Sequence, residues 1–173
     1  MLFEIFIEPQ FTNLDIIQKH LNNFFKFKNY INKHKIIIYT NINPNLLTIK
    51  KNSKINFIHI NSDIITIKQL WKQNIELYNN EEWIIHYNLK DRLIEFDFIK
   101  MILKKQKNTF VKKNSYEIYN NLFCIDKNLF MNYILNDDAI LNIEFIMQNT
   151  NNYYFLKYMN IISINEANEN IYI

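Results

Sequence analysis

The chain has 173 residues, of which 49% are hydrophobic and 16% aromatic, a composition that excludes an intrinsically disordered polar chain. It contains no glycine, which argues against the glycine-rich phosphate loops of Walker and dinucleotide-binding proteins. Its single cysteine, Cys124, excludes an internal disulfide and a cysteine-based zinc site, and its apolar neighbours predict a buried structural thiol.

The first two elements are predicted by the periodicity of the apolar residues. Residues 2–8 read as a strand, which Pro9 ends. A helix is expected to follow, with Thr12 as its cap and Asp15 at its positive end. Four apolar residues recur at helical spacing and predict its buried face: Leu14, Ile17, Leu21 and Phe24.

Further strands are expected at residues 34–39, 55–60 and 109–112, with shorter extended pieces at 46–49, 75–78 and 82–89. A second helix is predicted from Arg92 to about Lys105. The order β-α-β-β-β-α-β predicts an α+β fold, a small two-layer sandwich with two helices on one sheet face. A long hairpin arm is expected in its middle.

Residues 116–173 differ from the rest of the chain in charge and pattern. Residues 1–115 hold 18 basic and 10 acidic residues, a net charge of +8, whereas residues 116–173 hold 2 and 7, a net charge of −5. Short helices are predicted at 129–135 and 139–147. We therefore expect a basic α/β body with its arm at 1–115 and an acidic, apolar, mostly helical extension at 116–173.

Lysines gather around the predicted arm, where Phe57 and Trp71 are interleaved with them. Basic side chains neutralise phosphates, and aromatic rings stack on unpaired bases, so this pattern favours an RNA-binding arm. A solvated basic face with both aromatic residues in the core is the alternative. The predicted RNA-binding residues are Lys50, Lys51, Lys54, Lys68 and Lys72.

No catalytic or metal-binding residues, and no cofactor, are predicted. Ser62 and Asp63 follow a predicted strand without an identifiable base partner. Asp137 and Asp138 fit a metal-dependent transferase, but they are explained more simply as caps of the helix expected from Ala139. The four histidines lack the spacing of a metal motif and are interpreted as structural: His20, His34, His59 and His86.

Residues 1–115 resemble the small-subunit ribosomal protein ten family, also called the NusE family. Residues 2–7 and 13–17 are similar to its opening strand and helix. Residues 56–62 are similar to the outgoing strand of its hairpin arm, although Asp63 and Ile64 replace the Pro and His of its Ser-Pro-His signature. The resemblance implies a protein in the head of a small ribosomal subunit, with an arm that reaches into rRNA and neighbouring proteins.

The expected function is therefore that of a non-enzymatic structural subunit of a mitochondrial or other organellar small ribosomal subunit. Its expected partners are rRNA and neighbouring ribosomal proteins, with no membrane and no small-molecule substrate. The abundance of Ile, Asn, Lys, Phe and Tyr is typical of AT-rich genes, which places the protein in the mitochondrial matrix or another organelle, or in the cytoplasm of an endosymbiont or virus-infected cell. The alternatives are a nucleotide-sugar-dependent transferase-like α/β enzyme and a viral or plasmid accessory protein.

Overall fold

The computed structural model describes residues 1–25, 33–49, 53–61, 66–89, 91–93, 106–112, 115, 117–157 and 161–163. Within these ranges the helices are α1 (Leu14–Phe25), α3 (Ile67–Gln73), α5 (Lys127–Leu135) and α6 (Ile143–Asn149), with 3-10 turns η1 (Pro44–Leu46) and η2 (Ile75–Tyr78). The strands are β1 (Leu2–Phe6), β2 (Lys35–Thr40), β3 (Ile55–His59), β4 (Trp83–Asn88), β5 (Asp91–Leu93), β6 (Asn108–Lys112), β7 (Ile118–Asp126), β8 (Tyr153–Lys157) and β9 (Ile161–Ser163).

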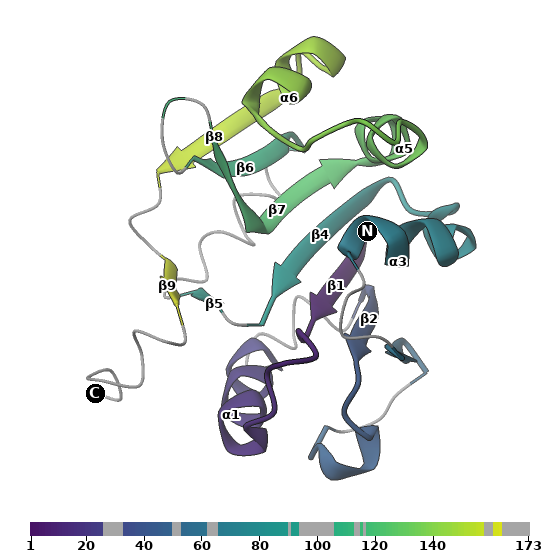
Figure 1. Ribbon diagram of the computed structural model, residues 1–173, viewed down its shortest axis with the longest axis vertical. Helices are drawn as coiled ribbons and strands as arrows, with labels where there is room; N and C mark the ends of the chain where they lie inside the picture. The colour runs from purple at the N-terminus through teal and green to yellow at the C-terminus, as the bar shows by residue number, and fades with distance from the viewer. Residues whose placement is uncertain are drawn as a thin grey trace.

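Seven strands form one mixed sheet in the order β3-β2-β1-β4-β7-β6-β8 (Figure 1). β1 pairs in parallel with β2 and with β4, so Leu2 lies between Lys35 and Ile84. β7 runs antiparallel to both of its neighbours, β4 and β6, and β8 pairs in parallel with β6. A separate two-stranded sheet joins β5 to β9. The large sheet thus draws strands from both predicted regions of the chain.

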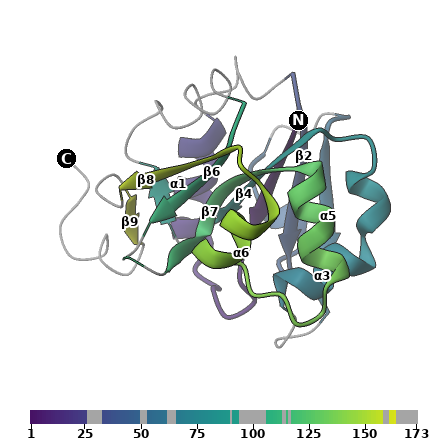
Figure 2. The same ribbon diagram turned by 90° about the horizontal axis from the view of Figure 1, so that it is seen from above.

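Helices cover both faces of this sheet (Figure 2). Alternate side chains of β1 point to opposite faces. Phe3 and Ile5 pack in the cluster that contains the buried side of α1, whereas Leu2 packs in the cluster that contains residues of α3, α5 and α6. Every residue of β1 is buried, as expected of a central strand with helices on both sides.

The α+β class is confirmed, but its layers differ from the prediction. The two-layer arrangement is replaced by helices on both faces of the sheet. β2 and β3 do not form the expected hairpin arm, because they pair in parallel, with Ile36 opposite Ile55, whereas a hairpin requires antiparallel strands. Alternation in the sequence predicted where these strands lie, and it carries no information about their direction.

The segment expected to continue the arm forms α3 instead. Thr66 accepts a hydrogen bond from the backbone N–H of Gln69, and the Gln69 side chain accepts one from the backbone N–H of Thr66, which makes a capping box. Leu70 and Trp71 lie on its buried side, and Trp71 is fully buried. Trp71 is therefore a core residue in this fold.

Several predicted boundaries also change. Asn13, rather than Thr12, caps α1, through a 3.2 Å bond from the backbone N–H of Ile16 to its Oδ1 atom. Leu14 is 38% exposed, so it does not belong to the buried face of α1. Arg92 lies in β5, not at a helix start, and residues 94–105 of the predicted second helix lie outside the described residues.

A polar cluster lies inside the core between the sheet and α3. Glu4, in the middle of β1, has no exposed surface. Its carboxylate accepts hydrogen bonds from the Trp71 indole N–H and from the Tyr78 hydroxyl, both at 2.6 Å, and lies 2.7 Å from Nδ1 of His86. The Tyr39 hydroxyl lies 2.7 Å from that of Tyr78, and burial together with the Glu4 charge raises the pKa of both tyrosines.

Candidate functional site

The strand order reverses beside β1, and this places a candidate site at one edge of the sheet. From β1 the chain adds β2 and β3 on one side and β4 on the other, all parallel. The arrowheads of β1, β2 and β4 point toward the same edge (Figure 1). In open α/β sheets, ligands bind outside the carboxyl ends of the strands at such a switch point.

Glu8 and Asn88 meet at this switch point. Glu8 follows β1 and is partly exposed, whereas Asn88 ends β4 and is 4% exposed. The Asn88 side-chain amide donates a 2.7 Å hydrogen bond to Oε1 of Glu8. The Gln10 side-chain amide donates to Oε2 of the same carboxylate. The Glu8 carboxylate therefore accepts from Asn88 at the end of β4 and from Gln10, which lies in the same first loop, residues 7–13, as Glu8 itself.

The loop that contains Glu8 is also bonded to the end of β2. Asn41 follows β2, and its side-chain amide donates a 3.0 Å hydrogen bond to the carbonyl oxygen of Pro9. Its Oδ1 atom is buried and has no hydrogen-bond partner in the part of the chain that the structure describes. Thr40 is buried beside it and accepts from the backbone N–H of Ile42. The first loop is thus held between the ends of β2 and β4.

The charge of this first loop is unusual for a phosphate site. Residues 7–13 include one carboxylate, that of Glu8, and no lysine, arginine or glycine. Phosphate loops use glycine backbone N–H groups and a basic side chain, so this loop does not have their composition. Among the described residues, no three His, Cys, Asp or Glu side chains gather into a metal-binding group.

The predicted RNA-binding lysines do not form one ribbon. Lys50 and Lys51 lie outside the described residues, and Lys54 is exposed just before β3. Lys68 and Lys72 lie on α3, on the face of the sheet that α5 and α6 also cover. RNA contact by these side chains stays a prediction.

Lys68 holds the connection between α5 and α6. Its ammonium donates to the carbonyl oxygens of Asn136, Asp137 and Ala139 at 2.6, 3.2 and 2.9 Å, and it lies 4.5 Å from the centre of the Tyr133 ring. An ammonium has three donors, so these three bonds match its capacity. Burial and the nearby Lys72 charge lower the pKa of Lys68.

Asp137 and Asp138 do not cap a helix, contrary to the prediction. Asn142 caps α6 instead, with its Oδ1 atom accepting from the backbone N–H of Phe145 at 2.8 Å. Asp137 forms an ion pair with Lys72, and this hydrogen bond and charge lower the pKa of the carboxyl group. Asp138 is exposed. The other candidates of the transferase alternative, Ser62 and Asp63, lie outside the described residues.

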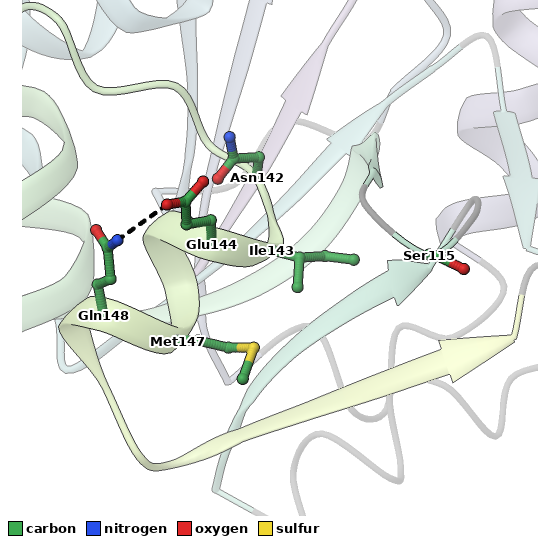
Figure 3. Close-up of a pocket in the computed structure, with 6 residues that line it drawn as sticks. All are labelled: Ser115, Asn142, Ile143, Glu144, Met147 and Gln148. Carbon is green, nitrogen blue, oxygen red and sulfur yellow. Dashed lines mark hydrogen bonds between the residues drawn. The ribbon is translucent and has the colours of Figure 1, made fainter.

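A hollow with a volume of about 420 Å³ lies beside α6 (Figure 3). Ile143 and Met147 project from α6 toward the turn that carries Ser115. Glu144 and Gln148 are bonded to each other at 3.2 Å along the helix. Among the described residues, Ser115 is the one polar side chain that faces Asn142, Glu144 and Gln148 across this hollow, so the edge at Glu8 and Asn88 is the better candidate.

No protein-family model and no curated protein matches the chain, but solved structures share its fold. A 4-diphosphocytidyl-2C-methyl-D-erythritol synthase from Anaerococcus prevotii aligns with a TM-score of 0.64 and 13% identity, over 95% of this chain and 92% of that one. HddC from Yersinia pseudotuberculosis, complexed with GMP-PN, aligns with a TM-score of 0.60 and 12% identity, over 95% and 94%. The bifunctional IspDF from Campylobacter jejuni aligns with a TM-score of 0.51 and 14% identity, over 90% of this chain and 49% of that one.

These similarities correct the expectations drawn from the ribosomal resemblance. The fold is shared with a 4-diphosphocytidyl-2C-methyl-D-erythritol synthase and with HddC, not with small-subunit ribosomal protein ten. The expectations of a non-enzymatic ribosomal subunit, of rRNA and ribosomal proteins as partners, and of no small-molecule substrate are wrong on the same ground, because the structures that share the fold include a synthase and a protein complexed with GMP-PN. In the described residues, no helix is long and apolar enough to cross a membrane.

Sequence reasoning missed Glu8 and Asn88 as site residues. They lie eighty positions apart in the chain, and only the parallel pairing of β1 with β4 brings them together. Each follows or ends a predicted strand, which is the signal that could have identified them. The carboxyl ends of two strands lie at the same edge of a sheet only when the strands are parallel. The expected antiparallel arm therefore gave no reason to place the ends of these strands together.

Proposed function

We propose that this chain is a nucleotide-dependent transferase that binds its nucleotide across the carboxyl ends of β1, β2 and β4. The observation that carries the proposal is the meeting of Glu8 and Asn88 at the point where the strand order reverses. The similarity to two nucleotidyltransferase structures over most of both chains supports it. Open α/β sheets bind nucleotides at this position for topological reasons, whatever the chemistry that follows.

The proposed reaction is nucleotidyl transfer. An oxygen of the acceptor forms a bond to the α-phosphorus of a nucleoside triphosphate, while the bond from that phosphorus to its bridging oxygen breaks and pyrophosphate leaves. The role of the described residues is positioning, because the loop between Ile7 and Asn13 is held by Asn88 on one side and Asn41 on the other. A Mg²⁺ ion that arrives with the nucleotide takes most of its ligands from phosphates and water, so it needs few protein carboxylates.

The proposal is tested first by binding. Calorimetric titration of the purified chain with the four common nucleoside triphosphates, in buffer that contains Mg²⁺, should show saturable binding of at least one of them. Asn88→Ala should weaken that binding, because it removes a donor in β4 that helps to position the Glu8 carboxylate. Asn79→Ala is the matched control, since Asn79 is exposed after η2, before β4 begins.

Turnover is tested next, by pyrophosphate release with a panel of sugar and polyol phosphates as acceptors. Release that requires both a triphosphate and an acceptor supports the proposal. Absence of nucleotide binding at millimolar concentration, by a protein that melts cooperatively, would overturn it.

A further inference from the structure

The two edge strands of the large sheet, β3 and β8, differ in the side chains that they expose (Figure 1). In β3 the exposed side chains are the polar Asn56 and His59, and the exposed Lys54 precedes the strand. In β8 the residues 153–156 are all aromatic or aliphatic, and Tyr154 is 37% exposed. Polar and charged residues at a sheet edge discourage pairing with other strands, and an apolar edge favours it. β8 therefore has the composition of a strand that pairs.

The backbone of β8 carries hydrogen-bonding groups that point away from β6. The backbone N–H of Asn108 donates to the carbonyl oxygen of Asn152 at 3.1 Å, and β8 then continues parallel to β6 without a shift of register. Alternate residues of a strand in a parallel ladder bond to the same neighbour, so residues 154 and 156 also bond toward β6. The backbone groups of Tyr153 and Phe155 point to the other side, where no strand of the described part of the chain pairs with them.

The side chains of β8 are complementary to a second copy of the same strand. Residues that lie opposite each other in an antiparallel pair share one face of the sheet. With a two-fold axis at Phe155, this ring meets its own copy on the face where it packs with Phe110. Tyr154 then lies opposite Leu156, which packs on the other face, in the cluster that contains α1. Both sides of the core would thus continue across the axis.

We infer that β8 is an interface at which two copies of this chain pair antiparallel about Phe155, so that two seven-stranded sheets join into one. A second copy fits because the edge is self-complementary on both faces and residues 153–156 carry no charge that would repel its copy. A two-fold contact of this kind is closed, since it uses the same edge of both copies. Strands of this length bury little area, so we expect a reversible dimer with a dissociation constant on the order of micromolar.

The unaltered protein provides the first test. Sedimentation equilibrium from low micromolar to submillimolar concentration should show a reversible monomer–dimer equilibrium, without any added nucleotide. A protein that stays monomeric over this range would overturn the inference. Because the measurement needs no ligand, its result does not depend on the proposed function.

Two variants of one residue test whether the dimer forms by strand pairing. Tyr153→Pro removes an outward N–H but no bond to β6, and the first residue of an edge strand tolerates proline. It removes two hydrogen bonds from the dimer, one for each copy, and should weaken association about tenfold or more. Tyr153→Ala is the matched control, because it loses the same side chain and keeps the N–H. Equal association of the two variants, both melting cooperatively, would show that the backbone of β8 is not the interface.

A cysteine on the proposed axis tests the register. Phe155→Cys places two thiols opposite each other, with Cα atoms about 5.5 Å apart, a separation that a disulfide spans. Cys124 is buried and does not compete. Mild oxidation should therefore link the two copies. Asn151→Cys is the matched control, because it is exposed and would lie about 27 Å from its copy along the paired strands. If Phe155→Cys does not link, or if Asn151→Cys links equally well, the inference is wrong.

Discussion

Replacing Glu4 by leucine removes the acceptor on which the buried polar cluster converges. The Trp71 indole N–H and the Tyr78 hydroxyl lose their partner, and Nδ1 of His86 loses its neighbour. A buried donor without a partner costs about 1–3 kcal/mol, so three such groups cost on the order of 3–9 kcal/mol. Domains of this size are stable by about 5–15 kcal/mol. We therefore expect Glu4→Leu to lose most of the stability of the fold.

Two milder variants allow the loss of stability in Glu4→Leu to be compared with smaller losses in the same cluster. Tyr78 uses its only proton on Glu4, so Tyr39 donates to Tyr78 at the outer end of the cluster, and Tyr39→Phe should cost only about 1 kcal/mol. Glu4→Gln keeps one oxygen that can accept from both Trp71 and Tyr78, so its cost should fall between the other two.

Urea denaturation followed by tryptophan fluorescence measures all three variants, because Trp71 is fully buried beside Glu4. The expected order of destabilisation is Tyr39→Phe, then Glu4→Gln, then Glu4→Leu. A Glu4→Leu variant within about 1 kcal/mol of the unaltered protein would show that the cluster does not hold α3 and η2 on the sheet.

Three further predictions concern other parts of the fold. Leu21→Ala should cost about 2–5 kcal/mol in urea denaturation because Leu21 is fully buried, whereas Leu14→Ala, at a 38% exposed site, should cost much less; equal losses would contradict the burial pattern of α1. The Cys124 thiol should react with a thiol reagent at pH 8 only after unfolding, because burial raises its pKa; rapid reaction of the folded protein would refute this. Asp137 has a lowered pKa, so its bond to Lys72 contributes stability above the ordinary value of 3.8 and loses it as the pH falls below that value. Asp137→Asn should therefore differ from the unaltered protein at neutral pH and match it near pH 2 in denaturation curves, and a constant difference would argue against this pair.

Local patterns predicted the positions of most strands, because each is a short apolar or alternating run that ends at a polar turn. β2 and β3 lie where these runs predicted them. Their direction depends on how the connection between them crosses the sheet, and residues 50–54 are compatible with either a hairpin or a crossover. Interpreting these two strands as a hairpin predicts a protruding arm. That arm supported the resemblance to small-subunit ribosomal protein ten, whose fold this chain does not share.

The candidate site was harder to predict than the strands. Glu8 is an ordinary polar residue after a strand until the register of β1 with β4 brings Asn88 within 2.7 Å of it. The lysines around Trp71 favour an arm, whereas the capping pattern from Thr66 to Gln69 indicates the helix α3 that the structure contains. That pattern is local and was available in the sequence.

The central position of β1 has a consequence for how the protein is made. Residues 2–6 are synthesised before β4, which pairs with one of their two edges, ends at Asn88 and is complete only on the order of ten seconds later. During that interval an apolar strand with an open edge is a target for pairing with other chains. Glu4 interrupts the apolar residues of this strand, and a charge in such a segment opposes aggregation. The carboxylate that organises the finished core thus also protects the nascent chain before that core exists.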